Sequence, residues 1–326
     1  MLTLASIRTP ERVIDHFAAV HRDGSATRPA ATRFGKGAAL EGLRNPVDPA
    51  CLLPLLDGRI DETTLLGRVH AGAHEHRPGW ELMFSAPKSV SLVALAGGDE
   101  RLVAAHDIAL KTALSWLEAE AACTRLGNGG KSQRHPTRCF LAIIVRHELS
   151  RAAEPHLHSR TLLINAPLAG PGQWCSLDGM PLFHAAKPAG IRYQQCLAEQ
   201  ALACGYDVCW YDNDTFELAV IPRRLALLLS SRAKTVERRL GEQGLSRPTA
   251  SIRQCECATR QAEAAQPPRL LDRQRQQDRH RAAQAGLDLA ALVARARQRG
   301  KALPLPVSAA TDDTSATPAT MHATGC

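Results

Sequence analysis

Three histidines in one stretch of the chain have the type and spacing needed to bind a divalent metal. His156 and His158 stand two residues apart in segment 156–165, whose apolar and β-branched residues predict a strand. Alternate side chains of a strand project from one face, so the two imidazoles lie together. His147 ends the preceding predicted strand, 137–147, and the short connection predicts an antiparallel hairpin that brings it beside them. Three imidazoles could then hold one ion, whose identity (Mg, Mn, Zn or Ni) the residues leave open, and polarise a phosphate oxygen.

The histidine pattern also has an interpretation without a metal. The chain contains 13 histidines, so two of them can fall two residues apart by chance. A second such pair, His74 and His76, lies in a predicted polar loop and is interpreted as surface. The third histidine across the predicted hairpin favours a metal, but the pattern alone leaves both interpretations open.

The charge balance favours a polyanionic partner. The 326 residues carry a formal net charge of +8, from 40 Lys and Arg against 32 Asp and Glu. Phosphate contacts and counterion release make nucleic acid the first candidate, and an ordinary basic surface is the alternative.

The ten cysteines and the apolar segments indicate the compartment. The first ten residues lack the apolar core of a secretory signal, and no run of about 18 apolar residues predicts a membrane span. We therefore expect a cytoplasmic, reducing location, where most cysteines behave as small buried apolar residues. Cys255 and Cys257 lack the second pair that a zinc site needs and are interpreted as part of a helix.

The order of the predicted elements indicates an α+β fold with a largely antiparallel sheet flanked by helices. A helix opens at Thr9-Pro10, a strand covers 79–84, and Ser85 is expected to cap a helix with Pro87 in its first turn. The later expected elements are a long helix after Asp99, a helix over 187–204 ended by Gly205, and short strands at 206–211 and 216–221.

Three regions follow from the change in composition along the chain. Residues 1–221 form the α+β core, 222–301 form an all-helical, arginine-rich extension of it, and 302–326 are predicted to be a disordered tail. The arginines of the extension line a DNA groove or an exposed helix face. A single glutamate, Glu237, stands against six basic residues between 222 and 240, which favours the groove.

Several blocks of residues, in order, resemble the TrwC/TraI-type (MobF) conjugative relaxase domain of the HUH endonuclease superfamily. They are Gly35-Lys36-Gly37-Ala38, the run from Gly79 to Ser91 with Phe84-Ser85-Ala86-Pro87-Lys88-Ser89-Val90-Ser91, His147-Glu148-Leu149-Ser150-Arg151, Leu157-His158-Ser159-Arg160 and Asn165. Further matches at Ser231-Arg232, Thr259-Arg260 and Asp278-Arg279 extend the resemblance over about residues 10–300.

This resemblance implies a site and a mechanism. In such relaxases a tyrosine near the N-terminus attacks a phosphodiester of single-stranded DNA and forms a 5′-phosphotyrosine, while three histidines hold a divalent metal. Carried over to this chain, it implies His147 and His158 as metal ligands and Glu81, which stands in place of the family's aspartate, as the acidic assistant of the nucleophile. The DNA-binding residues it implies are Lys88, Arg151, Arg160, Arg232 and Arg260. The implied partners are single-stranded DNA of a plasmid or mobile element and other conjugation or relaxosome proteins.

Two positions depart from the family pattern. The N-terminal region holds no tyrosine: Phe17 and His21 fall there, and the first tyrosine of the chain is Tyr193. The third histidine of the family corresponds to Arg160, which stays charged and cannot ligate a metal. His156 could replace the lost ligand, or Arg160 could itself contact the phosphate. Ser25, Thr27, His21 or a metal-bound water could replace the nucleophile.

Three functional hypotheses result. The first is a relaxase-type protein that binds, nicks and transfers single-stranded DNA, with strand transfer impaired by the missing tyrosine. The second is a catalytically inactive accessory protein that only binds single-stranded DNA. The third is a three-histidine metalloenzyme unrelated to DNA, which the block-by-block resemblance disfavours.

Overall fold

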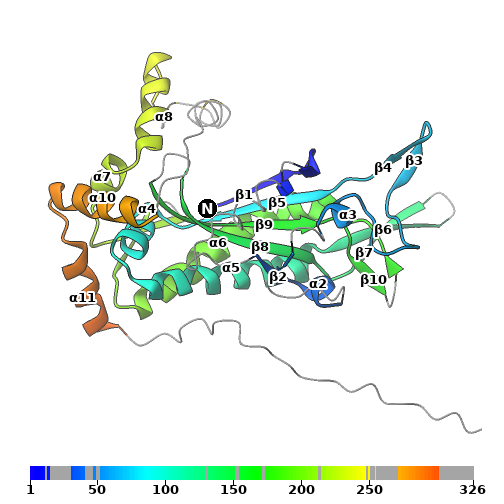
Figure 1. The fold of residues 1–326 in the computed structure, drawn as a ribbon, viewed down its shortest axis with the longest axis horizontal. Helices are drawn as coiled ribbons and strands as arrows, with labels where there is room; N and C mark the ends of the chain where they lie inside the picture. Colours follow the sequence, from blue (N-terminus) through cyan, green and yellow to red (C-terminus); the bar gives the residue numbers. More distant parts are fainter. Residues whose placement is uncertain are drawn as a thin grey trace, which may run out of the picture.

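A five-stranded antiparallel sheet forms the centre of the protein in a computed structural model. Its strands run in the order β1 (Leu2–Ser6), β5 (Gly79–Ser85), β9 (Pro155–Ile164), β8 (Leu141–Leu149) and β2 (Thr32–Phe34) (Figure 1). The structure describes residues 1–11, 13–14, 31–40, 47–48, 52–128, 131–150, 154–170, 173–211, 214–246, 249, 254 and 271–300. The predicted sheet and the pairing of β8 with β9 are confirmed.

Two long helices, α5 (Glu100–Ala121) and α6 (Gly179–Ala203), cover one face of this sheet (Figure 1). Asp99 caps α5 and Asp178 caps α6, each accepting a hydrogen bond from a backbone N–H of the first turn. The predicted helix after Asp99 is confirmed. The second helix was predicted from residue 187, but it begins at Gly179 and continues through Pro188.

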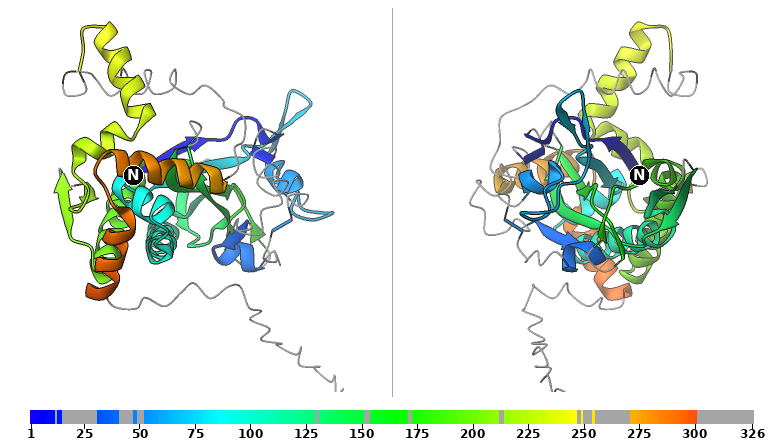
Figure 2. Two further views of the ribbon diagram at one scale, coloured as in Figure 1. Left: turned by 60° about the vertical axis from the view of Figure 1, so that its left-hand side comes forward. Right: turned by 90° about the vertical axis from the view of Figure 1, so that its right-hand side faces the viewer.

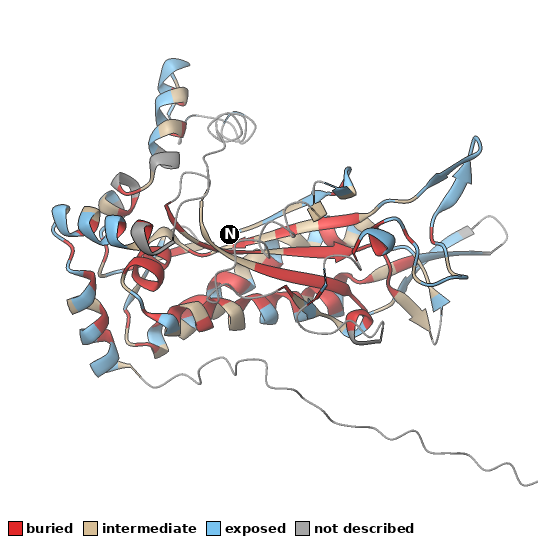
Figure 3. Ribbon diagram, viewed as in Figure 1, coloured by how far each residue is buried: buried red, intermediate tan, exposed pale blue. Residues whose placement is uncertain are grey.

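Apolar residues from alternate positions of β8 and β9 are buried on the opposite face. Ile143 and Leu162 pack there against α3 (Leu52–Leu56) in a second core cluster. The middle of the sheet is therefore buried on both faces, which explains why the strands read as nearly continuous apolar runs (Figure 3). This second cluster ends at Val145 on β8, and polar residues follow on the same face.

Four two-stranded ribbons and a C-terminal group of helices complete the described part of the chain. The ribbons are β3 (Arg68–His70) with β4 (Ala73–Glu75), β6 (Cys123–Asn128) with β7 (Lys131–Pro136), β10 (Leu168–Gly170) with β11 (Gln173–Trp174), and β12 (Val208–Tyr211) with β13 (Thr215–Leu218). His74 is exposed on one of these ribbons, not on an irregular loop.

The helices of the extension are α7 (Arg223–Leu228), α8 (Ser231–Glu242), α10 (Leu271–Gln284) and α11 (Leu289–Arg299). Two further short helices are α2 (Lys36–Leu40) and α4 (Lys88–Ser91), and α4 continues into η2, a π-helical turn at Leu92–Ala96. The expected cap at Ser85 is wrong: Pro87 precedes α4, and Ser85 belongs to β5. In the left view of Figure 2, α10 lies across the end of the sheet, and it contacts η2.

None of the helices in the described ranges has the length and apolar character required to cross a bilayer. The predicted tail at 302–326 and the Cys255 and Cys257 segment lie outside the described residues.

The Gly35-Lys36-Gly37 block docks the edge of the fold onto the start of β8. One carboxylate oxygen of Glu118 accepts hydrogen bonds from the backbone N–H groups of Lys36 and Phe140, each 2.8 Å long. The N–H of Gly37 donates to the carbonyl of Phe140 at 2.8 Å. Gly35 has a φ of +92°, and a Cβ there would overlap that carbonyl. This block is therefore needed for close backbone packing.

A chain of buried polar groups joins the helix layer to the back of β9. The ring Nδ1 of His106 lies 2.6 Å from the hydroxyl of Tyr193, and its Nε2 lies 2.8 Å from the hydroxyl of Ser159. All three residues have 0% exposure. Burial first, and then the positive charge of Arg146, lower the pKa of His106 well below its usual 6.5.

Replacing Gly35 by alanine is expected to lower the free energy of unfolding by about 3 kcal/mol, because left-handed strain and overlap with Phe140 add together. Gly72→Ala is the matched control, since Gly72 also has a positive φ, +81°, but a Cβ there meets nothing within 4 Å. Gly72→Ala should lower the free energy of unfolding by about 1 kcal/mol. Urea unfolding followed by circular dichroism measures both, and equal losses would show that the close approach at Gly35 contributes nothing.

The buried His106 predicts a loss of stability in acid. A histidine whose folded pKa is lowered stabilises the fold above its unfolded pKa of 6.5, and this contribution declines as the pH falls below that value. Below pH 6.5 the free energy of unfolding should fall by about 1.4 kcal/mol per pH unit from this residue alone. In urea titrations from pH 7.5 to about 5, His106→Gln should flatten the slope, while the exposed control His135→Gln should not. An unchanged slope in His106→Gln would rule out a buried neutral imidazole.

Candidate functional site

The three histidines singled out by the sequence meet where β8 and β9 pair. His147 lies directly opposite His158 in the strand register, and their ring centroids are 5.0 Å apart. His156 and His158 project from the same face of β9, with ring centroids 4.3 Å apart. The structure thus brings together all three imidazoles predicted to share one face, beyond the end of the second apolar cluster.

The arrangement of these rings does not match a metal centre. Both pairs stack with planes 20° apart, and ring nitrogens that lie in nearly parallel, separate planes do not converge readily on one ion. The Nδ1 of His158 also lies 2.8 Å from the carbonyl oxygen of His156. Within the described ranges, no three His, Cys, Asp or Glu side chains are grouped so that they could hold an ion. Imidazole is a suitable ligand chemically, but the metal role of His147, His156 and His158 stays a prediction that this geometry does not support.

Glu81 and Arg160 form an ion pair on the same face as the histidines. Arg160 follows His158 by two residues on β9, and Glu81 is on the neighbouring strand β5. The Nη1 of Arg160 donates to Oε1 of Glu81 at 2.9 Å. Arg160 is 21% exposed and Glu81 is 32% exposed, so solvent and a ligand can reach both side chains. A fixed positive charge thus occupies the place where the resemblance expects a third histidine.

Lys88 points into the protein. Its ammonium donates to the carbonyl of Pro155 at 3.1 Å and lies 3.8 Å from a carboxylate oxygen of Glu154. Burial lowers the pKa of Lys88, although Glu154 and Asp278 act in the opposite direction. In this arrangement Lys88 ties α4 to the start of β9, and its predicted contact with DNA stays a prediction.

The side chains of the three remaining predicted DNA contacts lie outside the part of the chain that the structure describes. Arg151 and Arg260 lie outside the described residues, and Arg232 is described only as part of the backbone of α8.

Helix α10 holds the turn end of the β8–β9 hairpin through ion pairs. Arg275 binds Glu148, the residue after His147, with an Nη2 to Oε2 distance of 2.8 Å. Arg281 lies 3.6 Å from Glu154, just before β9 begins. Both glutamates are partly or fully buried, at 13% and 4% exposure. Sequence reasoning missed these residues, because partners more than a hundred positions apart leave no local signal.

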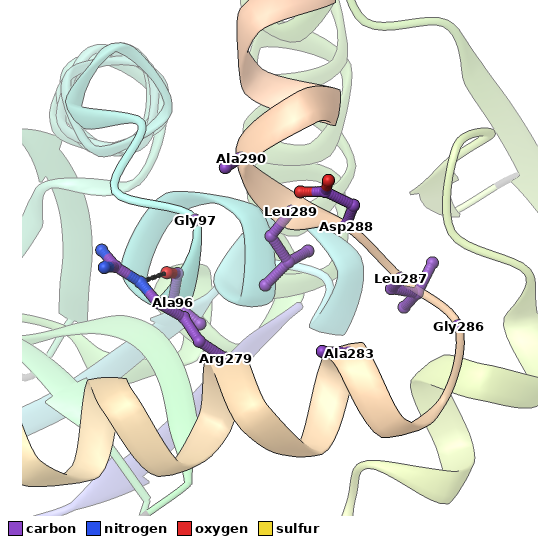
Figure 4. A pocket seen from close by; sticks show the side chains of 9 residues that line it. All are labelled: Ala96, Gly97, Arg279, Ala283, Gly286, Leu287, Asp288, Leu289 and Ala290. Atoms are coloured by element: carbon purple, nitrogen blue, oxygen red, sulfur yellow. Dashed lines mark hydrogen bonds between the residues drawn. The ribbon is translucent and has the colours of Figure 1, made fainter.

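A separate pocket of about 590 Å³ lies between η2, α10 and α11 (Figure 4). Arg279 donates through Nε to the carbonyl of Ala96 at its edge, and Leu287 and Leu289 line it. None of the predicted site residues is among those that line this pocket.

Comparison with known proteins identifies the lineage of this fold. The family model for TrwC relaxase matches residues 19–285. The multifunctional conjugation protein TraI of Escherichia coli (strain K12) is 34% identical over 218 residues, which are 64% of this chain and 12% of TraI. This chain therefore corresponds to a small part of the length of that relative.

Solved structures agree in fold over most of the chain. The metal-bound conjugative relaxase TrwC in complex with oriT DNA is 30% identical, with a TM-score of 0.81 over 89% of this chain and 100% of that one. TrwC complexed with a 27-mer DNA comprising the recognition hairpin and the cleavage site is 29% identical, with a TM-score of 0.79 over 89% of this chain and 100% of that one. The chain therefore belongs to the TrwC relaxase family.

Proposed function

We propose that this protein binds single-stranded DNA of a plasmid or mobile element across the sheet face that carries the histidines and the Glu81–Arg160 pair. One observation carries the proposal: the chain shares the fold of TrwC structures in complex with oriT DNA over 89% of its length. The face in question is polar, is partly accessible, and lies beyond the apolar cluster under α3.

The charge of the chain supports a nucleic-acid ligand. Its net charge of +8 favours association with a polyanion, and phosphate contacts release condensed counterions.

Strand transfer is the ancestral activity of the lineage. The positions of the tyrosine hydroxyls favour an impaired activity in this chain. Tyr193 and Tyr206 are buried, with their hydroxyls bonded to His106 and Asp99. Tyr211 is on β12, in a ribbon separate from the central sheet. The substitute nucleophiles Ser25, Thr27 and His21 lie outside the described residues, so they stay hypotheses.

Two alternative functions are supported to different degrees. A catalytically inactive accessory protein that binds single-stranded DNA shares the same face, and it differs from the proposal only in chemistry. A three-histidine metalloenzyme unrelated to DNA is disfavoured by membership of the TrwC relaxase family and by the stacked histidines.

The binding proposal predicts an affinity for single strands that falls steeply with salt. Fluorescence anisotropy with a labelled single strand should give a linear plot of log Kd against log salt concentration. With about six phosphate contacts, a fourfold rise in salt should weaken binding roughly 300-fold. The fully paired duplex of the same sequence serves as the comparison ligand and should bind more weakly. Absence of binding at low salt would reject the proposal.

The chemistry is tested by mixing the protein with labelled single-stranded DNA and Mn²⁺ and running a denaturing gel. We expect no covalent protein–DNA band, because no tyrosine lies in the N-terminal region. TrwC with its own oriT strand provides the positive control. A covalent band from this protein would contradict the expectation. Plain cleavage that disappears in Glu81→Ala and His158→Ala would instead establish a substitute nucleophile.

A further inference from the structure

We propose that the guanidinium of Arg160, oriented by Glu81, is the cation that binds a backbone phosphate of the DNA strand, so that this contact needs no metal ion. The inference rests on the proposed function, since it names the group that holds the strand on this face. The ligand class is a phosphodiester of single-stranded nucleic acid.

The position of Arg160 places a permanent charge over the middle of the sheet. In the register, Arg160 lies between Met83 of β5 and Val145 of β8, so strands flank it on both sides. Glu81 fixes one edge of the guanidinium through Nη1 at 2.9 Å. A planar group held in this way is preorganised to bind two oxygens of one phosphate.

The hydrogen-bonding capacity of Arg160 is not used up by the protein. A guanidinium carries five N–H donors, and Glu81 accepts from Nη1. The Nε of Arg160 is enclosed and finds no acceptor among the residues that the structure describes. An enclosed donor on a charged group without an acceptor is costly, and an anion with several oxygens would satisfy it.

Arg146 provides an internal comparison. It too has an enclosed Nε without an acceptor in the described residues, and it too is paired with a carboxylate, that of Asp107 on α5. Its side chain is 18% exposed, close to the 21% of Arg160. The difference is the face: Arg146 faces the helix layer, whereas Arg160 lies beside His158 on the polar face.

The same charge acts against a metal ion at the histidines. Side chains two residues apart on a strand are about 7 Å apart, so a dication on His158 would lie close to the guanidinium of Arg160. Like charges at that distance repel one another, and the repulsion weakens metal binding. The stacked rings and the fixed cation therefore point to the same arrangement, in which the protein itself supplies the positive charge.

The test measures the affinity of a labelled single strand for four proteins in the presence of EDTA: wild type, Arg160→Gln, Arg160→Lys and Arg146→Gln. Loss of a charge-assisted hydrogen-bonded contact should weaken binding by Arg160→Gln about ten- to a hundredfold. The salt slope should also become shallower by about 0.7, corresponding to one phosphate contact. Arg160→Lys should recover part of the loss, because it keeps the charge without the planar fork. Thermal melts verify that each variant is folded.

Arg146→Gln is the matched control and should bind DNA within about twofold of wild type, because it faces away from the strand. Wild-type affinity should be the same in EDTA and in Mn²⁺. Equal binding by wild type and Arg160→Gln would overturn this inference alone, whereas no binding by wild type would refute the proposed function itself. A tenfold loss of wild-type affinity in EDTA would also overturn the inference.

A second experiment changes both members of the Glu81–Arg160 pair at once. The double substitution Glu81→Asp with Arg160→His removes the guanidinium and restores the residue types implied by the family resemblance. Isothermal titration should then detect Mn²⁺ or Zn²⁺ binding at least tenfold tighter than to wild type. Equal metal affinity in the two proteins would show that Arg160 does not oppose a metal, and would overturn that part of the inference.

Discussion

Antiparallel pairing of β8 with β9 determines which side chains meet on the polar face. The register sets His147 opposite His158 and Val145 opposite Arg160. A slip of one residue would turn His158 and Arg160 toward α5 and α6. Burial prevents that slip, because Ile143 and Leu162 fill the cluster under α3 while the neighbouring positions fill the core under α5 and α6. The geometry of the site thus depends on buried apolar residues of β8 and β9 that are not themselves part of the site.

Beyond the end of this apolar cluster, ion pairs instead of apolar contacts hold the β8–β9 hairpin in place. The hairpin end that carries the histidines is held by Arg275 and Arg281 of α10 and by Lys88 of α4. Their glutamate partners are largely buried, so removing one member of a pair would leave a poorly solvated charge. Helix α10 of the C-terminal extension therefore helps to fix the geometry of the site through ion pairs at the turn end of the hairpin.

Local sequence pattern was sufficient to predict β5, β8, β9 and α5, because each has a strong apolar period or a capping residue. It failed for β1 and β2, since both are short edge strands and their pairing is long-range. It identified His147, His156 and His158 as candidates, and the resemblance to the relaxase family added Glu81 and Arg160. It could not show that the rings stack, that Glu81 binds Arg160, or that α10 fastens the hairpin, because these depend on side-chain direction and on distant partners.

The Glu81–Arg160 pair gives one physical reason for the residue types at positions 81 and 160. A histidine beside an acidic residue can bind a metal when neutral, but an arginine in its place keeps its charge and needs a carboxylate to orient it. The longer side chain of glutamate reaches across from β5 to β9 and supplies that carboxylate at 2.9 Å. In the proposed arrangement the paired guanidinium of Arg160 supplies the attraction for a phosphate. A guanidinium polarises a phosphate less than a dication does, so this proposed contact would hold the strand more than it would activate it for cleavage.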